Sequence, residues 1–265
     1  MENSSSFISA HASVNGIQMY YEIHGSGRPL VLIHGGGSAI GTTFGKILPL
    51  LAEKFRCIAV ELQAHGRTSD RDAPESFEQD ASDVASLLDH LGISSADILG
   101  FSNGAQTAMQ LGISYPAKVG KLVLVSGFSK RSGVPAGFWE GMNNASFSDM
   151  PQAFKDEFLK LNNDPDALMN MFQKDVQRMQ TFKGWPDDAL HSIRATTLVL
   201  SGDHDVATPE HAVELFRLIP RCSLAIIPGG HGAALGEITT LVNDKWKQEY
   251  VVQLIEQFLM QAEQL

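Results

Sequence analysis

The segment Gly100-Phe101-Ser102-Asn103-Gly104 decides how the rest of the chain is interpreted. It follows the mostly apolar run Ala96-Asp97-Ile98-Leu99 and precedes small, helix-favouring residues. This pattern predicts a strand, a sharp turn and a helix. Such a turn holds Ser102 in a strained backbone conformation, and a side chain two residues to either side would collide with the strand or the helix. Gly100 and Gly104 meet this requirement.

Composition and charge bound the class of protein. With 265 residues and 43% hydrophobic content, the chain can bury a large core as one domain. Its net charge of −10 disfavours nucleic acid and anionic membrane surfaces as partners. No apolar run reaches the length of a membrane span, and residues 1–10 are Ser-rich and lack the features of a secretory signal. We therefore expect a cytoplasmic protein with a small-molecule partner, and a homo-oligomer stays an open alternative.

Both cysteines of the chain lie in apolar, strand-like surroundings. Cys57 stands in Phe55-Arg56-Cys57-Ile58-Ala59-Val60, and Cys222 stands in Arg221-Cys222-Ser223-Leu224. This context favours buried free thiols over a disulfide or a pair of metal ligands.

Strands and helices alternate along most of the chain. An Asn15-Gly16 turn between two extended stretches predicts an antiparallel hairpin at the start. The predicted strands that follow are 29–33, 55–62, 96–101, 121–125, 197–200 and 223–227, and the predicted helices include 46–54, 77–91, 209–218 and 246–260. This alternation predicts an α/β fold with a doubly wound, mostly parallel sheet of about eight strands.

The strand pattern disappears between residues 128 and 194. This segment is rich in Met and Phe at helical spacing and is interrupted by four prolines, so we expect an inserted helical cap on a core formed by residues 1–127 and 195–265. So apolar a lid, with few basic residues, favours an apolar substrate. The residues that we expect to line the substrate pocket are Gly35, Phe128, Phe138, Trp139 and Met142.

Serine, histidine and carboxylate side chains follow the predicted strands. A serine hydroxyl becomes a good nucleophile only when a base takes its proton, and the base needs a carboxylate to orient it. Ser102 follows one strand, and His231 lies in the glycine-bracketed loop after the last strand, whereas His211 is expected on the surface of a helix. Both Asp203 and Asp205 follow the strand 197–200, and residues two apart point the same way in an extended segment, so either can serve.

Several motifs together resemble the α/β-hydrolase superfamily, in its branch of single-domain esterases, lactonases, perhydrolases and carbon–carbon bond hydrolases. The resemblance covers nearly the whole chain. It rests on the segment 100–104 and on His34-Gly35-Gly36-Gly37, Glu61-Leu62-Gln63-Ala64-His65-Gly66-Arg67-Thr68, Gly202-Asp203-His204-Asp205 and Gly230-His231-Gly232.

The resemblance implies roles for particular residues. Ser102 is the nucleophile at a nucleophile elbow, His231 the base, and Asp205, the second carboxylate of its motif, the acid. The oxyanion hole consists of the backbone amides of Gly36 and Asn103. A glycine at position 36 lets its N–H approach an oxyanion closely. We expect no cofactor and no metal ion, because the sequence contains no phosphate-binding loop and no cluster of metal ligands.

Four residues at or just after the ends of two predicted strands need a separate interpretation. His34 and His65 are interpreted as residues that brace loops. The family commonly has Asp where this chain has Glu61 and Gly where it has Ala64, so the turn at this place is expected to differ in detail.

The residues and the resemblance together predict a serine hydrolase that acts on an uncharged, mainly apolar carboxylic ester or lactone through an acyl-enzyme. The alternatives that stay open are a carbon–carbon bond hydrolase, a perhydrolase or acyltransferase with the same triad, and a ligand receptor with slow turnover.

Overall fold

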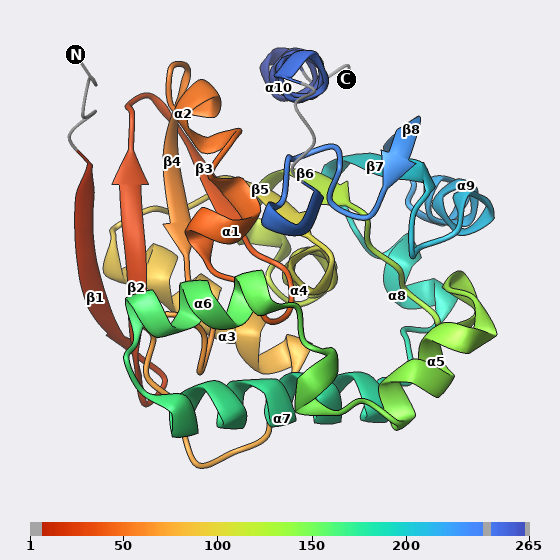
Figure 1. Ribbon diagram of the computed structural model, residues 1–265. Coiled ribbons are helices and arrows are strands. Elements are labelled where there is room, and N and C mark those ends of the chain that lie inside the picture. Colours follow the sequence, from red (N-terminus) through yellow and green to blue (C-terminus); the bar gives the residue numbers. More distant parts are fainter. Residues whose placement is uncertain (1–6, 241–244, 263–265) are drawn as a thin grey trace.

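The computed structural model describes residues 7–240 and 245–262 (Figure 1). Residues 1–6, on which part of the expectation about a secretory signal rests, lie outside the described residues. Among the described helices, none is both long and apolar enough to cross a membrane.

One eight-stranded sheet forms the centre of the molecule, in the order β1-β2-β4-β3-β5-β6-β7-β8. The strands are β1 (Ile8–Val14), β2 (Ile17–His24), β3 (Arg28–Ile33), β4 (Phe55–Val60), β5 (Ala96–Phe101), β6 (Val119–Val125), β7 (Thr196–His204) and β8 (Cys222–Gly230). β4, β3, β5, β6, β7 and β8 are parallel, and β1 and β2 are antiparallel to their neighbours. The predicted fold class is therefore confirmed.

The antiparallel edge forms for the reason that the sequence indicates. Val14 pairs with Ile17 across a two-residue turn. Asn15 (φ 44°) and Gly16 (φ 88°) both have positive φ, which is the geometry of the tight hairpin turns whose twist matches that of the strands.

Helices cover both faces of the sheet, and each interface is a separate apolar cluster. On one face lie α3 (Phe77–His90), α4 (Asn103–Ser114), α8 (Asp187–His191) and α9 (Pro209–Leu218). On the other face lie α1 (Ile40–Phe44), α2 (Leu48–Leu51) and α10 (Lys245–Met260). The strands between them are apolar on both faces because both faces are buried.

The segment between β6 and β7, here called the helical insertion (residues 128–194), contains no strand. Its helices are α5 (Ala136–Asn143), α6 (Gln152–Leu161), α7 (Pro165–Thr181) and α8. Figure 1 shows α6 and α7 beyond the end of the sheet toward which the β4 arrow points, which is the carboxyl end of the parallel strands. Ligand sites of open parallel sheets lie at that end.

Both cysteines are free thiols, as predicted. Cys57 is buried in β4 and Cys222 is half-buried at the start of β8. Burial raises the pKa of each thiol to about 12, so neither is a reactive thiolate at neutral pH.

Candidate active site

Ser102 lies at the turn between β5 and α4 in a conformation that residues with a side chain rarely adopt, with φ 52° and ψ −122°. The two flanking glycines make this turn possible. A Cβ atom on Gly100 would lie 2.1 Å from the Gly104 carbonyl oxygen, and one on Gly104 would lie 2.1 Å from the Ile33 carbonyl oxygen. The turn therefore projects the Ser102 side chain beyond the end of β5.

His231 connects Ser102 to a carboxylate. Its Nε2 atom lies 3.1 Å from Ser102 Oγ, and its Nδ1 atom lies 2.7 Å from Asp205 Oδ1. The Asp205 side chain is fully buried, whereas about a third of the His231 side chain is exposed. Burial favours the neutral acid, but the hydrogen bond from His231 and others hold the pKa of Asp205 below its ordinary value. The carboxylate is thus ionised and oriented toward the imidazole.

The two aspartates that the sequence left as alternatives lie in different environments. Asp203 is exposed and accepts a hydrogen bond of 2.8 Å from the Gly229 N–H. The register of β7 against β8 shifts between Gly202 and His204, so the alternation of side chains is interrupted at Asp203. This irregularity is the reason why Asp203 and Asp205 do not face the same group.

The loop after β3 lies beside the turn that carries Ser102. Ile33 pairs with Gly100 in the sheet, so the ends of β3 and β5 are level. A Cβ atom on Gly36 would lie 2.5 Å from Asn103 Nδ2, which leaves no space for a side chain there. The Asn103 N–H belongs to the first turn of α4, where amides have no partner within the helix. Gly36 and Asn103, the two residues expected to supply the oxyanion amides, are therefore neighbours in the structure.

A cavity of about 290 Å³ opens over Ser102 and His231 between the sheet and the helical insertion. Most of its wall is apolar. The residues that line it are Gly36, Gly37, Ser102, Asn103, Phe128, Phe138, Met142, Ala145, Asp149, Met150, Pro151, Phe154, Met171, Phe172, Asp175, Val176, Met179, Val206 and His231.

Of the expected pocket residues, Phe128, Phe138 and Met142 line this cavity, and Gly35 and Trp139 do not. The Trp139 side chain is buried against Phe128 and Phe182, and its Nε1–H donates to the Arg131 carbonyl at 2.7 Å. Gly35 packs against Phe101 and Ser102, where a Cβ atom would be 3.0 Å from the Phe101 ring and 3.3 Å from Ser102 Cβ. The sequence identified the helix that carries Trp139 but not which of its faces meets the cavity.

Two other histidines, His34 and His211, are buried and accept hydrogen bonds from backbone N–H groups. His34 Nε2 accepts a hydrogen bond of 3.0 Å from the Leu62 N–H, and burial lowers the pKa of His34 to about 3, so the ring is neutral. His211 is buried, contrary to the expectation of a surface position, and its Nε2 accepts from the Ser129 N–H at 2.9 Å. The loop from β6 into the helical insertion packs over α9 and covers this ring.

The two residues that depart from the family pattern, Glu61 and Ala64, lie at either side of a turn that hydrogen bonds keep closed. Ala64 takes φ 61°, a value that glycine adopts more easily. Glu61 is buried, and its carboxylate accepts hydrogen bonds from the Arg67 backbone N–H (2.7 Å) and from Arg67 Nε (3.0 Å). The longer acid therefore closes the turn through Arg67.

The sequence reasoning missed Asp175, a carboxylate on α7 that lines the cavity and accepts a hydrogen bond of 2.5 Å from the Gly37 N–H. The signal was present in the spacing. Asp175 stands three or four residues from Met171, Phe172 and Met179, which line the cavity too. A single carboxylate on the apolar face of a predicted helix is the pattern that could have identified it.

A model of the alpha/beta hydrolase family matches residues 30–237. The chain belongs to that family. Serine hydrolase BPHL of Homo sapiens is 28% identical over 237 residues, which cover 85% of this chain and 80% of BPHL. The likeness to a family of hydrolases confirms the predicted resemblance and supports a hydrolytic enzyme.

Solved structures show the same fold at lower identity. A serine hydrolase involved in carbazole degradation (CarC) has a TM-score of 0.78 and 21% identity, over 96% of this chain and 99% of the other. The enol-lactonase from Burkholderia xenovorans LB400 has a TM-score of 0.73 and 18% identity, over 95% of this chain and all of the other.

Proposed function

We propose that this protein hydrolyses uncharged, mainly apolar carboxylic esters or lactones through an acyl-enzyme on Ser102. The observation that carries the proposal is the hydrogen-bonded series Ser102, His231 and Asp205 at the base of an apolar cavity. In this proposal the helical insertion is a cap that selects the acyl group.

The first half of the reaction acylates the serine. Ser102 Oγ attacks the ester carbonyl carbon while His231 Nε2 takes the hydroxyl proton. Asp205 stabilises the imidazolium and keeps Nδ1 protonated. The oxyanion of the tetrahedral intermediate accepts hydrogen bonds from the Gly36 and Asn103 amides. When the intermediate collapses, the carbon–oxygen bond breaks and His231 returns the proton to the leaving alcohol, which in a lactone stays attached to the acyl chain.

The second half repeats these roles with water. His231 takes a proton from a water molecule that attacks the acyl carbon, and the same amides hold the second oxyanion. The Ser102 oxygen leaves and recovers its proton from His231. No other group has to supply or remove a proton or an electron.

The composition of the cavity wall favours an uncharged, apolar acyl group. Its described lining contains two carboxylates, Asp149 and Asp175, and neither Lys nor Arg. An anionic acyl group would therefore lose its hydration without gaining a Lys or Arg partner from this lining. Phenylalanine and methionine side chains cover most of the remaining surface, and methionine adapts to irregular shapes.

The test compares 4-nitrophenyl esters from acetyl to octanoyl. Each buried methylene contributes about 0.8 kcal/mol, so kcat/KM should rise several-fold per pair of carbons until the cavity is full. A fluorophosphonate should label Ser102 with loss of this activity. A series that is flat or falls from acetyl onward would contradict the apolar-acyl proposal. Multiple turnovers would argue against the alternative of a slow-turnover receptor.

A further inference from the structure

Asp175 is the point at which the helical insertion touches the glycine loop after β3. Its Oδ2 atom accepts the Gly37 N–H at 2.5 Å, and its Oδ1 atom lies 3.4 Å from Asn103 Nδ2. A Cβ atom on Gly36 would be 3.2 Å from the same carboxylate. Asp175 therefore contacts both segments that supply the proposed oxyanion amides.

The loop needs such an anchor because it contains three consecutive glycines. Glycine has more backbone freedom than any other residue, and Gly37 has a φ of 65°. The peptide unit between Gly36 and Gly37 is planar, so a hydrogen bond that fixes the Gly37 N–H also fixes the plane of that peptide. The ψ angle of Gly36 is then restricted, which limits how its own N–H can turn.

A carboxylate beside an oxyanion would oppose catalysis unless its charge were balanced. Two cations balance it. His65 Nε2 lies 3.1 Å from Asp175 Oδ2, and Arg178, one turn further along α7, forms an ion pair with Asp175. Burial opposes the charge on His65, but Asp175 raises the pKa of His65 to about 9, so the ring is cationic at neutral pH.

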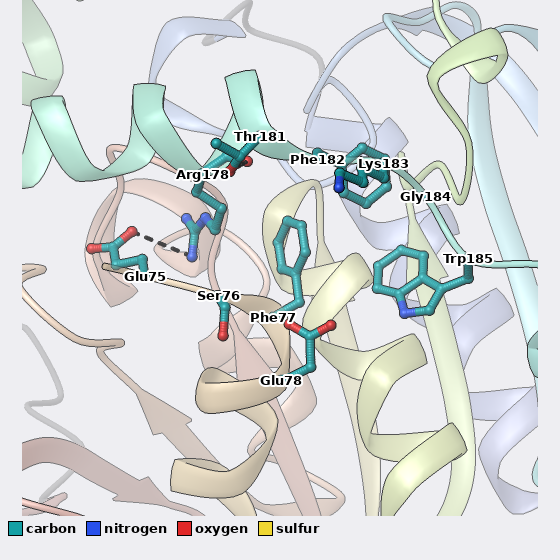
Figure 2. A pocket seen from close by; sticks show the side chains of 10 residues that line it. All are labelled: Glu75, Ser76, Phe77, Glu78, Arg178, Thr181, Phe182, Lys183, Gly184 and Trp185. Carbon is teal, nitrogen blue, oxygen red and sulfur yellow. Dashed lines mark hydrogen bonds and ion pairs between the residues drawn. The ribbon is translucent and has the colours of Figure 1, made fainter. Parts of the chain in front are cut away.

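Arg178 also contacts two carboxyl groups outside the helical insertion, those of Asp80 and Glu75. Its Nη1 atom lies 2.8 Å from Asp80 Oδ2 and 3.4 Å from Glu75 Oε2. Figure 2 shows Arg178 extending from α7 toward Glu75, at the edge of a second cavity of about 240 Å³. All three side chains are buried. These contacts thus fix α7, and with it Asp175, relative to the core.

We propose that Asp175 is a positioning residue for the oxyanion hole: by accepting the Gly37 N–H from the helical insertion, it holds the Gly36 amide in the orientation that binds the transition state. This inference rests on the proposed function. It assigns to the insertion a part in catalysis in addition to substrate selection.

The experiment measures oxyanion binding directly with a pair of ketones. Ser102 Oγ adds to the carbonyl carbon of an alkyl trifluoromethyl ketone, and the hydroxyl proton moves to His231. The carbonyl oxygen becomes an oxyanion, which occupies the oxyanion hole. The methyl ketone with the same alkyl chain binds without this addition. The ratio of the two inhibition constants therefore reports the oxyanion hole separately from the apolar cavity.

Asp175→Ala should weaken the trifluoromethyl ketone relative to the methyl ketone by about 10- to 100-fold, because the Gly36 donor loses its fixed orientation. It should lower kcat more than it changes KM. Asp175→Asn keeps an oxygen that can accept the Gly37 N–H, and its ratio should stay within about threefold of the unmodified protein. The matched control is Lys174→Gln, which removes an ion pair of the same helix with Asp70 and does not touch the loop.

Asp175→Ala removes one carboxylate partner from two buried cations, His65 and Arg178. The double variant Asp175→Ala with Arg178→Met is therefore measured against Arg178→Met alone, and the same fall in the ratio is expected. An unchanged ratio in the alanine variants, or an equal fall in Asp175→Asn, would overturn the inference. If the trifluoromethyl ketone bound the unmodified protein no better than the methyl ketone, the proposed function would fail together with it.

Discussion

The Ser126 hydroxyl lies 2.5 Å from Asp205 Oδ2, although the two residues follow different strands, β6 and β7. The Gly202 N–H donates to the same oxygen at 3.1 Å, and the Val206 N–H donates to the other at 2.7 Å. The Asp205 carboxylate thus accepts hydrogen bonds from Ser126, Gly202 and Val206, and it also contacts the His231 imidazole. This arrangement distinguishes Asp205 from Asp203 on geometry alone.

Asp205→Asn is expected to lower kcat roughly ten-thousandfold, since an amide in this place favours the wrong tautomer of the base. Asp203→Asn is the matched control, because Asp203 is two residues away and its carboxylate meets only the Gly229 N–H among the described contacts. Steady-state kinetics with a short ester measures both. Should Asp203→Asn be the inactive variant, the assignment of the acid is reversed.

Ser102→Ala should abolish turnover and the covalent labelling of the protein by a fluorophosphonate. The backbone strain at this position belongs to the turn, so the thermal unfolding temperature should change little. Mass spectrometry of the labelled protein checks the result. Labelling of the alanine variant to the same extent as the unmodified protein would falsify the role of Ser102 as nucleophile.

Phe138→Ala should reduce kcat/KM for octanoyl esters more than for acetyl esters, because its ring lines the cavity and a short acyl chain does not need that surface. Phe216→Ala is the control, since Phe216 lies on α9, outside the cavity lining, and is 40% exposed. Equal losses on both esters would indicate that Phe138 supports the fold instead of the acyl chain.

A hemisuccinate ester should be a poorer substrate than the butyrate ester of the same alcohol. The two acyl chains have the same length, but the hemisuccinate carries a carboxylate into a cavity whose described lining has two carboxylates of its own. Because His65 and Arg178 already balance Asp175, the loss comes mainly from moving the substrate carboxylate out of water into a largely apolar cavity whose described lining has neither Lys nor Arg. We expect this desolvation to lower kcat/KM at least about tenfold. Equal rates, or a preference for the hemisuccinate, would show that a cation reaches the substrate.

Stability should fall as the pH rises from about 6.5 to 9. His65 has its pKa raised from 6.5 to about 9, and burial raises the pKa of Glu75 from 4.5 to about 8. In this window the folded protein holds protons that the unfolded chain has already released, so the free energy of unfolding decreases with pH. The groups that face these two side chains are Asp175, Arg178, Asp80 and the neutral ring of His34.

Urea denaturation at several pH values measures this slope. In Glu75→Gln the side chain at position 75 is neutral at every pH. The substitution should therefore remove the part of the pH dependence of the unfolding free energy that comes from Glu75 and leave the part that comes from His65. A free energy of unfolding that is constant or rises across the window would contradict these protonation states.

The sequence predicted the sheet well because its strands are buried on both faces and carry a strong local signal. The strand 96–101 and the helix 209–218 have the predicted bounds. The helix predicted over 46–54 is only the single turn α2, and β7 and β8 extend beyond the predicted strands, to His204 and Gly230. The extra residues of β7 and β8 pair with each other, as in His204 with Gly230, and such pairing depends on a partner elsewhere in the chain that local patterns do not contain.

The candidate site was predictable where a short motif by itself determines the local backbone conformation. Ser102 between two glycines is such a case, and so is His231 between glycines. Asp175 is different, because its contact with Gly37 joins residues 138 positions apart. The local sequence does not indicate which turn of a helix will contact which loop, so a hydrogen bond of this kind becomes visible only when the tertiary structure is known.

The methionines of the cavity wall have a chemical consequence of their own. Met142, Met150, Met171 and Met179 line the cavity over Ser102. Oxidation by peroxide converts a thioether into a polar, chiral sulfoxide. Each such oxygen would replace a dry contact by a group that prefers water, while Ser102, His231 and Asp205 kept their chemistry. On the proposed function, oxidation would thus lower the activity first on the longest, most apolar esters, and methionine sulfoxide reductases would restore it.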